Sequence, residues 1–196
     1  ALKSDKLHVA SRIDYARQLA GNGELDKALE QLNQGLVYSP RNFYLLRLKA
    51  RVHQDLKQWP QLENTAFELQ KIANRDPLGF HLYGLALQAT RRLDQSRDAF
   101  QEAVNRSPNA VQSLTALART YFAQGDLETA LRQLDSALKA TPNDLAALNL
   151  RGEVLLALKR FDEAEAPFEK ALSIRPEWTV PYQNLGEARL AQGDAA

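Results

Sequence analysis

The sequence of 196 residues contains no cysteine and no methionine, and it has only three histidines. Without cysteine there are no disulfide bonds, no thiolate metal ligands and no cysteine nucleophile. The absence of cysteine is compatible with both a reducing and an oxidising compartment. No run of 18 apolar residues occurs, so we expect no membrane insertion of this segment. The histidines are isolated, and we expect neither a metal nor another cofactor. A cytoplasmic and a bacterial periplasmic location are both compatible with these features.

Motifs of catalytic sites are missing too. The chain has no H-E-x-x-H, no G-x-S-x-G and no phosphate-binding G-x-x-x-x-G-K-[ST] segment. Clustered carboxylates such as Asp162, Glu163 and Glu165 fit the start of a helix and a solvated face better than acid–base chemistry. We therefore predict that the chain is not an enzyme.

The chain also lacks an excess of either charge, with 25 Lys and Arg residues against 24 Asp and Glu residues. It offers no strong overall field to nucleic acid or to an anionic membrane surface, so electrostatic selectivity must be local. The balance is uneven, because residues 43–110 hold ten basic and seven acidic side chains and residues 111–196 hold nine and twelve. This polarity would orient an elongated partner, or it would set contacts between two arrays.

The sequence contains a repeated pattern of 34 residues, which is clearest over residues 145–178. That stretch predicts a helix, a tight turn, a second helix and a stop at proline. The same phase gives repeats at 9–42, 43–76, 77–110, 111–144 and 145–178, with a half repeat at 179–196. A small residue occupies the middle of every first helix: Ala16, Ala50, Gly84, Ala118, Gly152 and Gly186. Small side chains at fixed spacing allow two helices to approach closely.

The second helices carry matching residues at their starts, at their packed positions and at their ends. Large residues that would fill the space between the helices are Leu32, Phe100, Leu134 and Phe168. Carboxylates or a proline at the helix start are Asp26, Pro60, Asp94, Glu128 and Asp162. Prolines that would stop the helix are Pro40, Pro108, Pro142 and Pro176.

These residues resemble the tetratricopeptide repeat, a 34-residue unit with the pattern W-x2-L-G-x2-Y, then A-x3-F, then P. The clearest matches are Tyr182, Leu185 and Gly186 in the first part, Ala164 and Phe168 in the second, and Pro176 at the end. The resemblance covers essentially the whole chain. It implies an all-α fold, a right-handed superhelix of antiparallel helix pairs, forming one array over residues 1–196. It also implies that the first helices line a concave groove that holds a peptide or a partner's segment.

Polar residues on that face of the first helices are the candidate binding site. They are Arg17, Tyr44, Arg47, Arg51, His81, Gln112, Arg119 and Asn149. Arginine is the commonest residue in the set, and its planar fork binds carboxylates, so we expect an acidic or C-terminal peptide. The alternative is a solvated face whose arginines pair with their neighbours. Some tetratricopeptide repeats clamp a peptide C-terminus with Lys and Asn, but Ile13 and Arg17 stand at those positions and do not match.

Two repeats depart from the pattern. In the second, Leu62 and Leu69 replace small residues, and we expect its packing to differ locally. In the fifth, Pro167 removes the N–H that would bond to the Glu163 carbonyl, which predicts a kink. Arg151 also replaces an expected leucine there, with an aliphatic stem that can still pack.

The two ends look like cuts through a longer array. Residues 1–8 fall in the phase of a helix that closes a preceding repeat, and the chain stops where a second helix should begin. We therefore expect the natural protein to continue in both directions.

Three function classes follow from these features. The first is a non-catalytic protein-protein interaction scaffold that binds a peptide or a partner subunit. The alternative is a module that positions a substrate within a larger bacterial export or enzyme assembly. Binding of single-stranded nucleic acid needs a basic groove with stacking aromatics, and the near-zero net charge argues against it.

Overall fold

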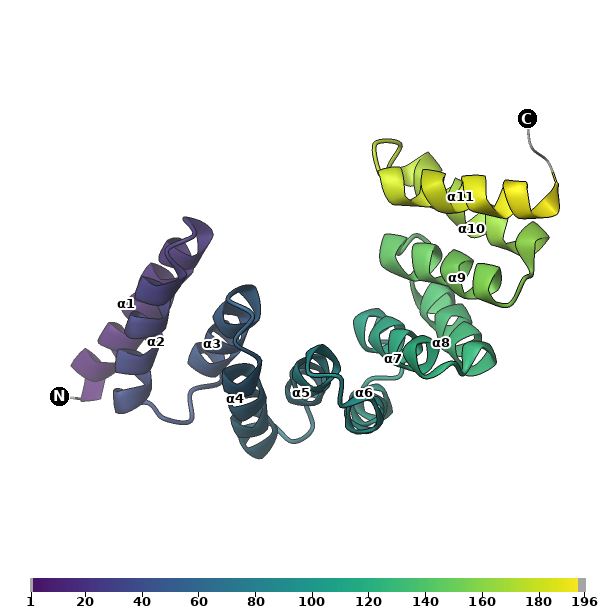
Figure 1. The fold of residues 1–196 in the computed structure, drawn as a ribbon. Coiled ribbons are helices and arrows are strands. Elements are labelled where there is room, and N and C mark those ends of the chain that lie inside the picture. Colours follow the sequence, from purple (N-terminus) through teal and green to yellow (C-terminus); the bar gives the residue numbers. More distant parts are fainter. Residues whose placement is uncertain (1, 194–196) are drawn as a thin grey trace. The chain divides into compact units, whose positions relative to one another are not determined.

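The computed structural model describes residues 2–193 of the chain, with side chains from residue 9 onward (Figure 1). These residues form α-helices joined by short connections and contain no strand. The helices are α1 Leu2–Gly21, α2 Leu25–Tyr38, α3 Phe43–Asp55, α4 Trp59–Ile72, α5 Pro77–Ala89, α6 Leu93–Arg106, α7 Val111–Gln124, α8 Leu127–Ala140, α9 Leu145–Ala157, α10 Phe161–Ile174 and α11 Thr179–Gln192. The predicted all-α fold of helix pairs is confirmed. Residues 194–196 of the half repeat lie outside the described range.

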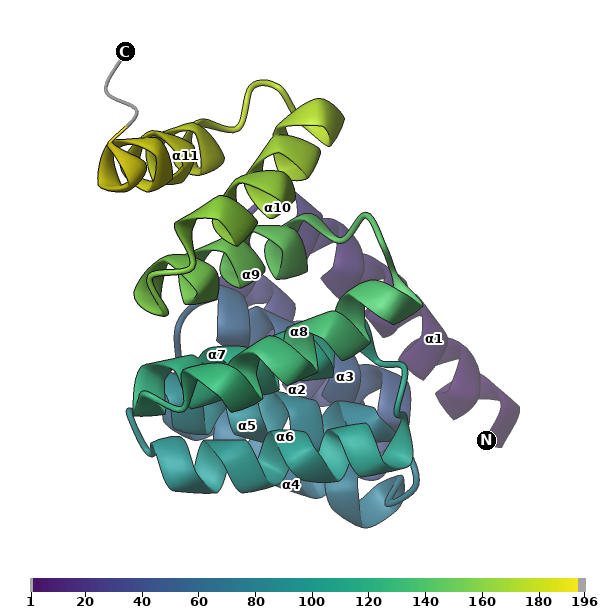
Figure 2. The ribbon, with the colours of Figure 1, turned by 90° about the vertical axis from the view of Figure 1, so that its right-hand side faces the viewer.

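The chain divides into two compact units. The N-terminal unit, Ala1–Arg106, contains α1 to α6, and the C-terminal unit, Ser107–Ala196, contains α7 to α11. The sequence predicts one array over residues 1–196, and each compact unit is built from the same repeat. Within each unit, first and second helices pair as antiparallel hairpins, for example α5 with α6 and α9 with α10 (Figures 1 and 2).

The helix boundaries follow the 34-residue period. First helices begin at residues 43, 77, 111, 145 and 179, each 34 residues after the one before. The second helices α2, α6, α8 and α10 each end two residues before a proline, as the stop positions predict. Helix α10 continues through Pro167, which is buried inside it.

The N-terminal end differs from the sequence prediction. Helix α1 begins at Leu2 and continues to Gly21, so residues 2–8 extend the first helix and do not close a separate preceding one. Lys6 stands where the other repeats have their stop proline, and no glycine or proline interrupts residues 2–20. Nothing in this stretch ends the helix, which explains its continuation.

The carboxylates at the starts of three second helices lie inside the first turn. Asp26, Asp94 and Asp162 face the positive end of the helix dipole there. Side-chain caps occur at the second helix α8, where Asp126 accepts from the backbone of Thr129 at 3.2 Å, and at first helices. The Asn42 side chain accepts from the backbone of Tyr44 at 3.0 Å, and that of Asp144 accepts from Ala147 at 2.8 Å.

The irregular second repeat packs large residues where other repeats have small ones. Leu62 and Leu69 on α4 are almost completely buried, although the other repeats have small residues there. Elsewhere along α4 the contact is with Gly79 on α5, where a Cβ atom would lie 2.8 Å from the backbone nitrogen of Gln70. This glycine lets α5 approach the backbone of α4 closely.

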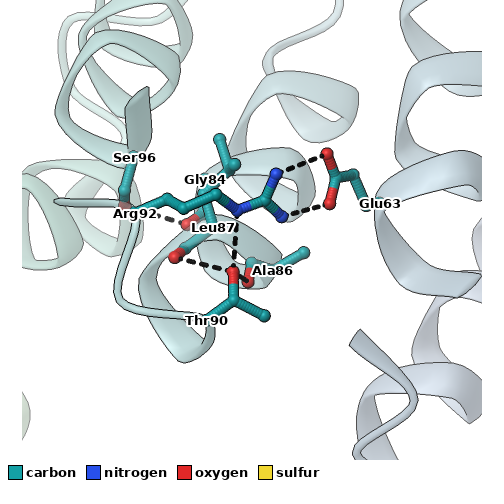
Figure 3. Close-up of polar contacts among 7 residues, drawn as sticks. All are labelled: Glu63, Gly84, Ala86, Leu87, Thr90, Arg92 and Ser96. Atoms are coloured by element: carbon teal, nitrogen blue, oxygen red, sulfur yellow. Dashed lines mark hydrogen bonds and ion pairs between the residues drawn. The ribbon is translucent and has the colours of Figure 1, made fainter. Parts of the chain in front are cut away.

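Arg92 joins the turn between α5 and α6 to helix α4 of the N-terminal unit (Figure 3). Its guanidinium binds both carboxylate oxygens of Glu63 on α4, and its Nε donates to the Thr90 hydroxyl at 3.0 Å in the turn between α5 and α6. In the same view the Ser96 hydroxyl on α6 donates to the Gly84 carbonyl on α5 at 2.9 Å. These bonds fix the turn and the pair that it connects.

Candidate functional site

Helix α3 presents three exposed residues of the predicted face. Leu45, Leu46 and Ala50 bury one side of this helix in the core, so the side chains of Arg47 and Arg51 are left on the other side and are exposed. The two arginines are four residues apart and therefore lie one turn apart on the same face.

Tyr44 extends this surface toward the start of α3. Its side chain is 65% exposed, and its ring meets that of Phe43 edge to face with 5.8 Å between the centroids. A large exposed ring beside two guanidinium groups provides an apolar contact surface next to positive charge. Tyr44, Arg47 and Arg51 together are called the α3 patch below.

The two arginines of the α3 patch are not neutralised within the protein. Among the described residues neither forms an ion pair, whereas Arg92 pairs with Glu63 and Arg106 with Glu102. Like charges four residues apart on a helix repel by a few tenths of a kcal/mol. A carboxylate from another molecule would relieve that repulsion, because it would meet two forks at once.

Arg17 lies on α1, which contacts α3 within the N-terminal unit. Its guanidinium is 3.0 Å from the carboxylate of Asp14, and both side chains are strongly exposed. An exposed pair of this kind contributes less than about 1 kcal/mol, so Arg17 can exchange its partner at little cost. For Arg17, pairing with a neighbour therefore occurs as the alternative interpretation expects.

His81 on α5 is only partly exposed. Its ring packs against that of Phe100 with 5.5 Å between the centroids, and burial lowers the pKa of His81 to about 4. The imidazole is therefore neutral at pH 7. It adds a polar surface to the predicted face but no positive charge.

The predicted residues of the C-terminal unit have a different character. Gln112 and Arg119 on α7 are exposed, but Asn149 on the neighbouring helix α9 is 8% exposed. The Asn149 amide donates to the Glu153 carboxylate at 2.6 Å and accepts from Asn184 on α11 at 3.4 Å. On α9 the predicted binding face therefore carries the Glu153 carboxylate and the hydrogen-bonded amides of Asn149 and Asn184. The positive charge that Arg119 gives to this face on α7 does not continue onto α9.

The structure thus places two adjacent uncompensated positive charges of this face on α3. Sequence analysis missed a further exposed basic surface, formed by Lys139 on α8 and Lys170 on α10. The available signals were the two departures in the fifth repeat, Arg151 and Pro167, which line the same hollow.

Neither a metal-binding cluster nor a membrane-spanning helix is found within residues 2–193. No group of three His, Asp or Glu side chains in this range is placed to hold a metal ion. Within the same range no helix is long and apolar enough to cross a membrane.

Repeated antiparallel helix pairs of 34 residues, with a glycine against a phenylalanine in the pairs α5–α6 and α9–α10, define a helical-repeat protein. Family models of the tetratricopeptide repeat match residues 9–34, 82–130 and 115–177. The chain belongs to the tetratricopeptide repeat family.

Known proteins with similar sequence or structure agree with this assignment. A DnaJ homolog subfamily C member 7 homolog of Dictyostelium discoideum is 27% identical over 84% of this chain, which spans about a third (34%) of that relative. The structure of TTC0263, a thermophilic tetratricopeptide repeat protein of Thermus thermophilus, has a TM-score of 0.76 and 21% identity, covering 93% of this chain and 99% of that one. YrrB, described as a protein with an unusual peptide-binding site, has a TM-score of 0.67 and 17% identity, covering 88% and 89%. The two structures show a shared fold.

Proposed function

We propose that this chain is a non-catalytic protein-protein interaction scaffold that binds an acidic peptide or an acidic segment of a partner subunit at the α3 patch. The observation that carries the proposal is the exposed pair Arg47 and Arg51, which has no counter-ion among the described residues. YrrB, which shares the fold, has a peptide-binding site according to its description, and this supports peptide binding by the fold in general.

The overall charge of the chain, more than the guanidinium groups themselves, favours an acidic peptide over nucleic acid as the ligand of the patch. Two guanidinium forks one turn apart match carboxylates on one short acidic segment, and Tyr44 offers a ring for an adjacent apolar side chain. The net charge of +1 gives no long-range field of the kind that non-specific nucleic-acid binding needs. Recognition is therefore local and concentrated on α3.

The test compares partner capture by the intact chain and by the double variant Arg47→Glu/Arg51→Glu. Reversing both charges turns attraction of a carboxylate into repulsion, and we expect capture to weaken by about tenfold or more. Partners are eluted, identified by mass spectrometry and then measured one at a time by titration.

A matched control separates the site from overall charge. Arg41 and Arg75 lie in exposed connections of the same unit and form no ion pair among the described residues, so Arg41→Glu/Arg75→Glu makes the same change in net charge elsewhere. This control should retain the partners. Equal retention by both double variants would show that the α3 patch is not the binding site, provided that circular dichroism shows both to be folded.

A further inference from the structure

A hollow of about 310 Å³ lies in the C-terminal unit between α8, α9 and α10. Leu138, Leu148 and Pro167 form its apolar part. Its basic side chains are Lys139, Arg151 and Lys170. A second hollow, of about 540 Å³, is lined by Pro108, Asn109 and the last turn of α8, and it shares Lys139 with the first. Lys139 therefore stands at the junction of two adjoining depressions.

The sequence of the fifth repeat explains why the first hollow exists. Arg151 occupies the position that Leu117 holds in the preceding repeat, and Leu117 is completely buried. The guanidinium of Arg151 reaches outward instead, and its Nε donates to Asp135 on α8 at 2.9 Å. An outward arginine in place of a buried leucine leaves space beside Leu148.

Pro167 removes one helical hydrogen bond from this region. A proline has no N–H, so the helical bond that residue 167 would make to the carbonyl of Glu163 cannot form. That carbonyl lies one turn before the proline that lines the hollow. It can accept a hydrogen bond from the backbone N–H of a bound chain.

The charges around the hollow contrast with the rest of the unit. Residues 111–196 hold nine basic against twelve acidic side chains, and arginines such as Arg160 and Arg189 are paired with carboxylates. Lys139 and Lys170 make no ion pair among the described residues. Asp135 also lines the hollow, but it pairs with Arg151, so the two lysines are left as the charges without an ion pair beside its apolar part.

We propose that this hollow is a second binding site, separate from the α3 patch, which takes an acidic segment of a partner protein. One apolar side chain of the segment occupies the space beside Leu138, Leu148 and Pro167. Carboxylates on either side of it meet Lys139 and Lys170. Arg151 follows Asn149 by two residues on α9, so the two side chains point in directions about 200° apart around the helix axis. The hollow therefore lies away from the face of α9 that carries the candidate binding residue Asn149.

Titration followed by nuclear magnetic resonance tests the proposal on the whole chain labelled with nitrogen-15. The probe is a short peptide with a central leucine and two glutamates on each side. We expect saturable shifts of the backbone amides in residues 135–139 and 163–170, with millimolar or tighter affinity. Replacing the leucine by glycine, or the glutamates by glutamines, should weaken binding by about fivefold or more.

Two charge-reversal variants locate the peptide. Lys139→Glu/Lys170→Glu should weaken binding by about tenfold. Lys159→Glu/Arg175→Glu changes the net charge equally within the same unit, in the exposed connections before and after α10, and should bind as the unchanged chain does. Absence of a saturable shift, shifts centred on Arg119, or equal weakening by both variants would each overturn the proposal. The α3 patch is unchanged throughout, so shifts of the amides in residues 43–55 would report its own binding of the acidic peptide separately from binding at the hollow.

Discussion

A Cβ atom on Gly84 would lie 2.7 Å from both Cδ1 and Cε1 of the Phe100 ring. Phe100 is completely buried, and the Ser96 hydroxyl bonds to the Gly84 carbonyl, so α5 and α6 are held at this separation. Real Cβ atoms do not approach a neighbour this closely, and a tightly packed ring has little room to move. The small residue in the middle of the first helix is therefore a steric requirement of the large residue that faces it.

We expect Gly84→Ala to destabilise the N-terminal unit by about 1–3 kcal/mol, because the added methyl group overpacks the contact with Phe100. The loss should exceed the gain of up to about 1 kcal/mol in helix propensity. Urea unfolding followed by far-ultraviolet circular dichroism measures the difference. Gly186→Ala is the control, since no atom lies within 4 Å of a Cβ there, and it should be neutral or stabilising. Similar losses for both variants would contradict the steric explanation.

Replacing Arg91 by glycine should stabilise the N-terminal unit by about 0.5–1 kcal/mol. Arg91 has a φ of 59°, in the left-handed region that costs a residue with a Cβ atom about this much. The corresponding turn of the C-terminal unit has Gly125 at a φ of 83°. The change Gly125→Ala should lower the free energy of unfolding by about 1 kcal/mol. Thermal unfolding measures the expected gain for Arg91→Gly and the expected loss for Gly125→Ala. A less stable Arg91→Gly variant would mean that the arginine side chain makes a contribution larger than the strain.

The residue just before α7 is the place of a missing cap. Ala110 precedes this helix and supplies no side-chain bond, whereas Asp144 caps α9. We expect Ala110→Asp to raise the free energy of unfolding by about 1 kcal/mol and Asp144→Ala to lower it by a similar amount. Denaturant titration measures both. Ala110→Leu, which cannot accept a hydrogen bond, should show no gain.

Acidification should destabilise the N-terminal unit through His81. Its pKa is about 4 in the folded chain and near 6.5 when unfolded, so between these values the unfolded state binds the proton and the folded state does not. The contribution of neutral His81 to the free energy of unfolding is therefore fully present above pH 6.5 and is lost as pH falls toward 4. The free energy of unfolding decreases over this range by at most about 1.4 kcal/mol per pH unit.

The difference between the unchanged chain and His81→Gln, measured at several values between pH 7 and 4.5, isolates this effect. Burial also lowers the pKa of His53, and that contribution stays in both proteins and cancels in the difference. A difference that does not change with pH would show that His81 is protonated equally in both states.

The fold was largely predictable because the repeat combines several independent signals. Prolines such as Pro40 and Pro176 marked the helix ends to within two residues, and Gly84 and Phe100 marked a contact between paired helices. The beginning of the chain was less predictable. Counting back one period from Pro40 leads to Lys6, which lacks the physical property that stops a helix.

The candidate site was predictable in its positions but not in its charges. Spacing alone placed Arg47, Arg51 and Asn149 on first helices, yet exposure separated them, because Asn149 is engaged with Glu153. The neutral state of His81 depends on its burial beside Phe100, a contact across 19 residues. Partners of this kind are set by tertiary packing, which the order of residues does not reveal directly.

The basic residues with positive φ have a further consequence for proteolysis. Lys57, Arg91 and Lys159 are exposed and lie in the turns inside three of the helix pairs. Trypsin cleaves after lysine and arginine, and exposed turns are preferred sites of nicking. Brief digestion should therefore cut between α3 and α4, between α5 and α6 and between α9 and α10, as well as at Arg41 and Arg75 in the exposed connections between pairs, and spare the turns built on Gly23 and Gly125. The fragment pattern would then follow the basic connections between helices along the chain.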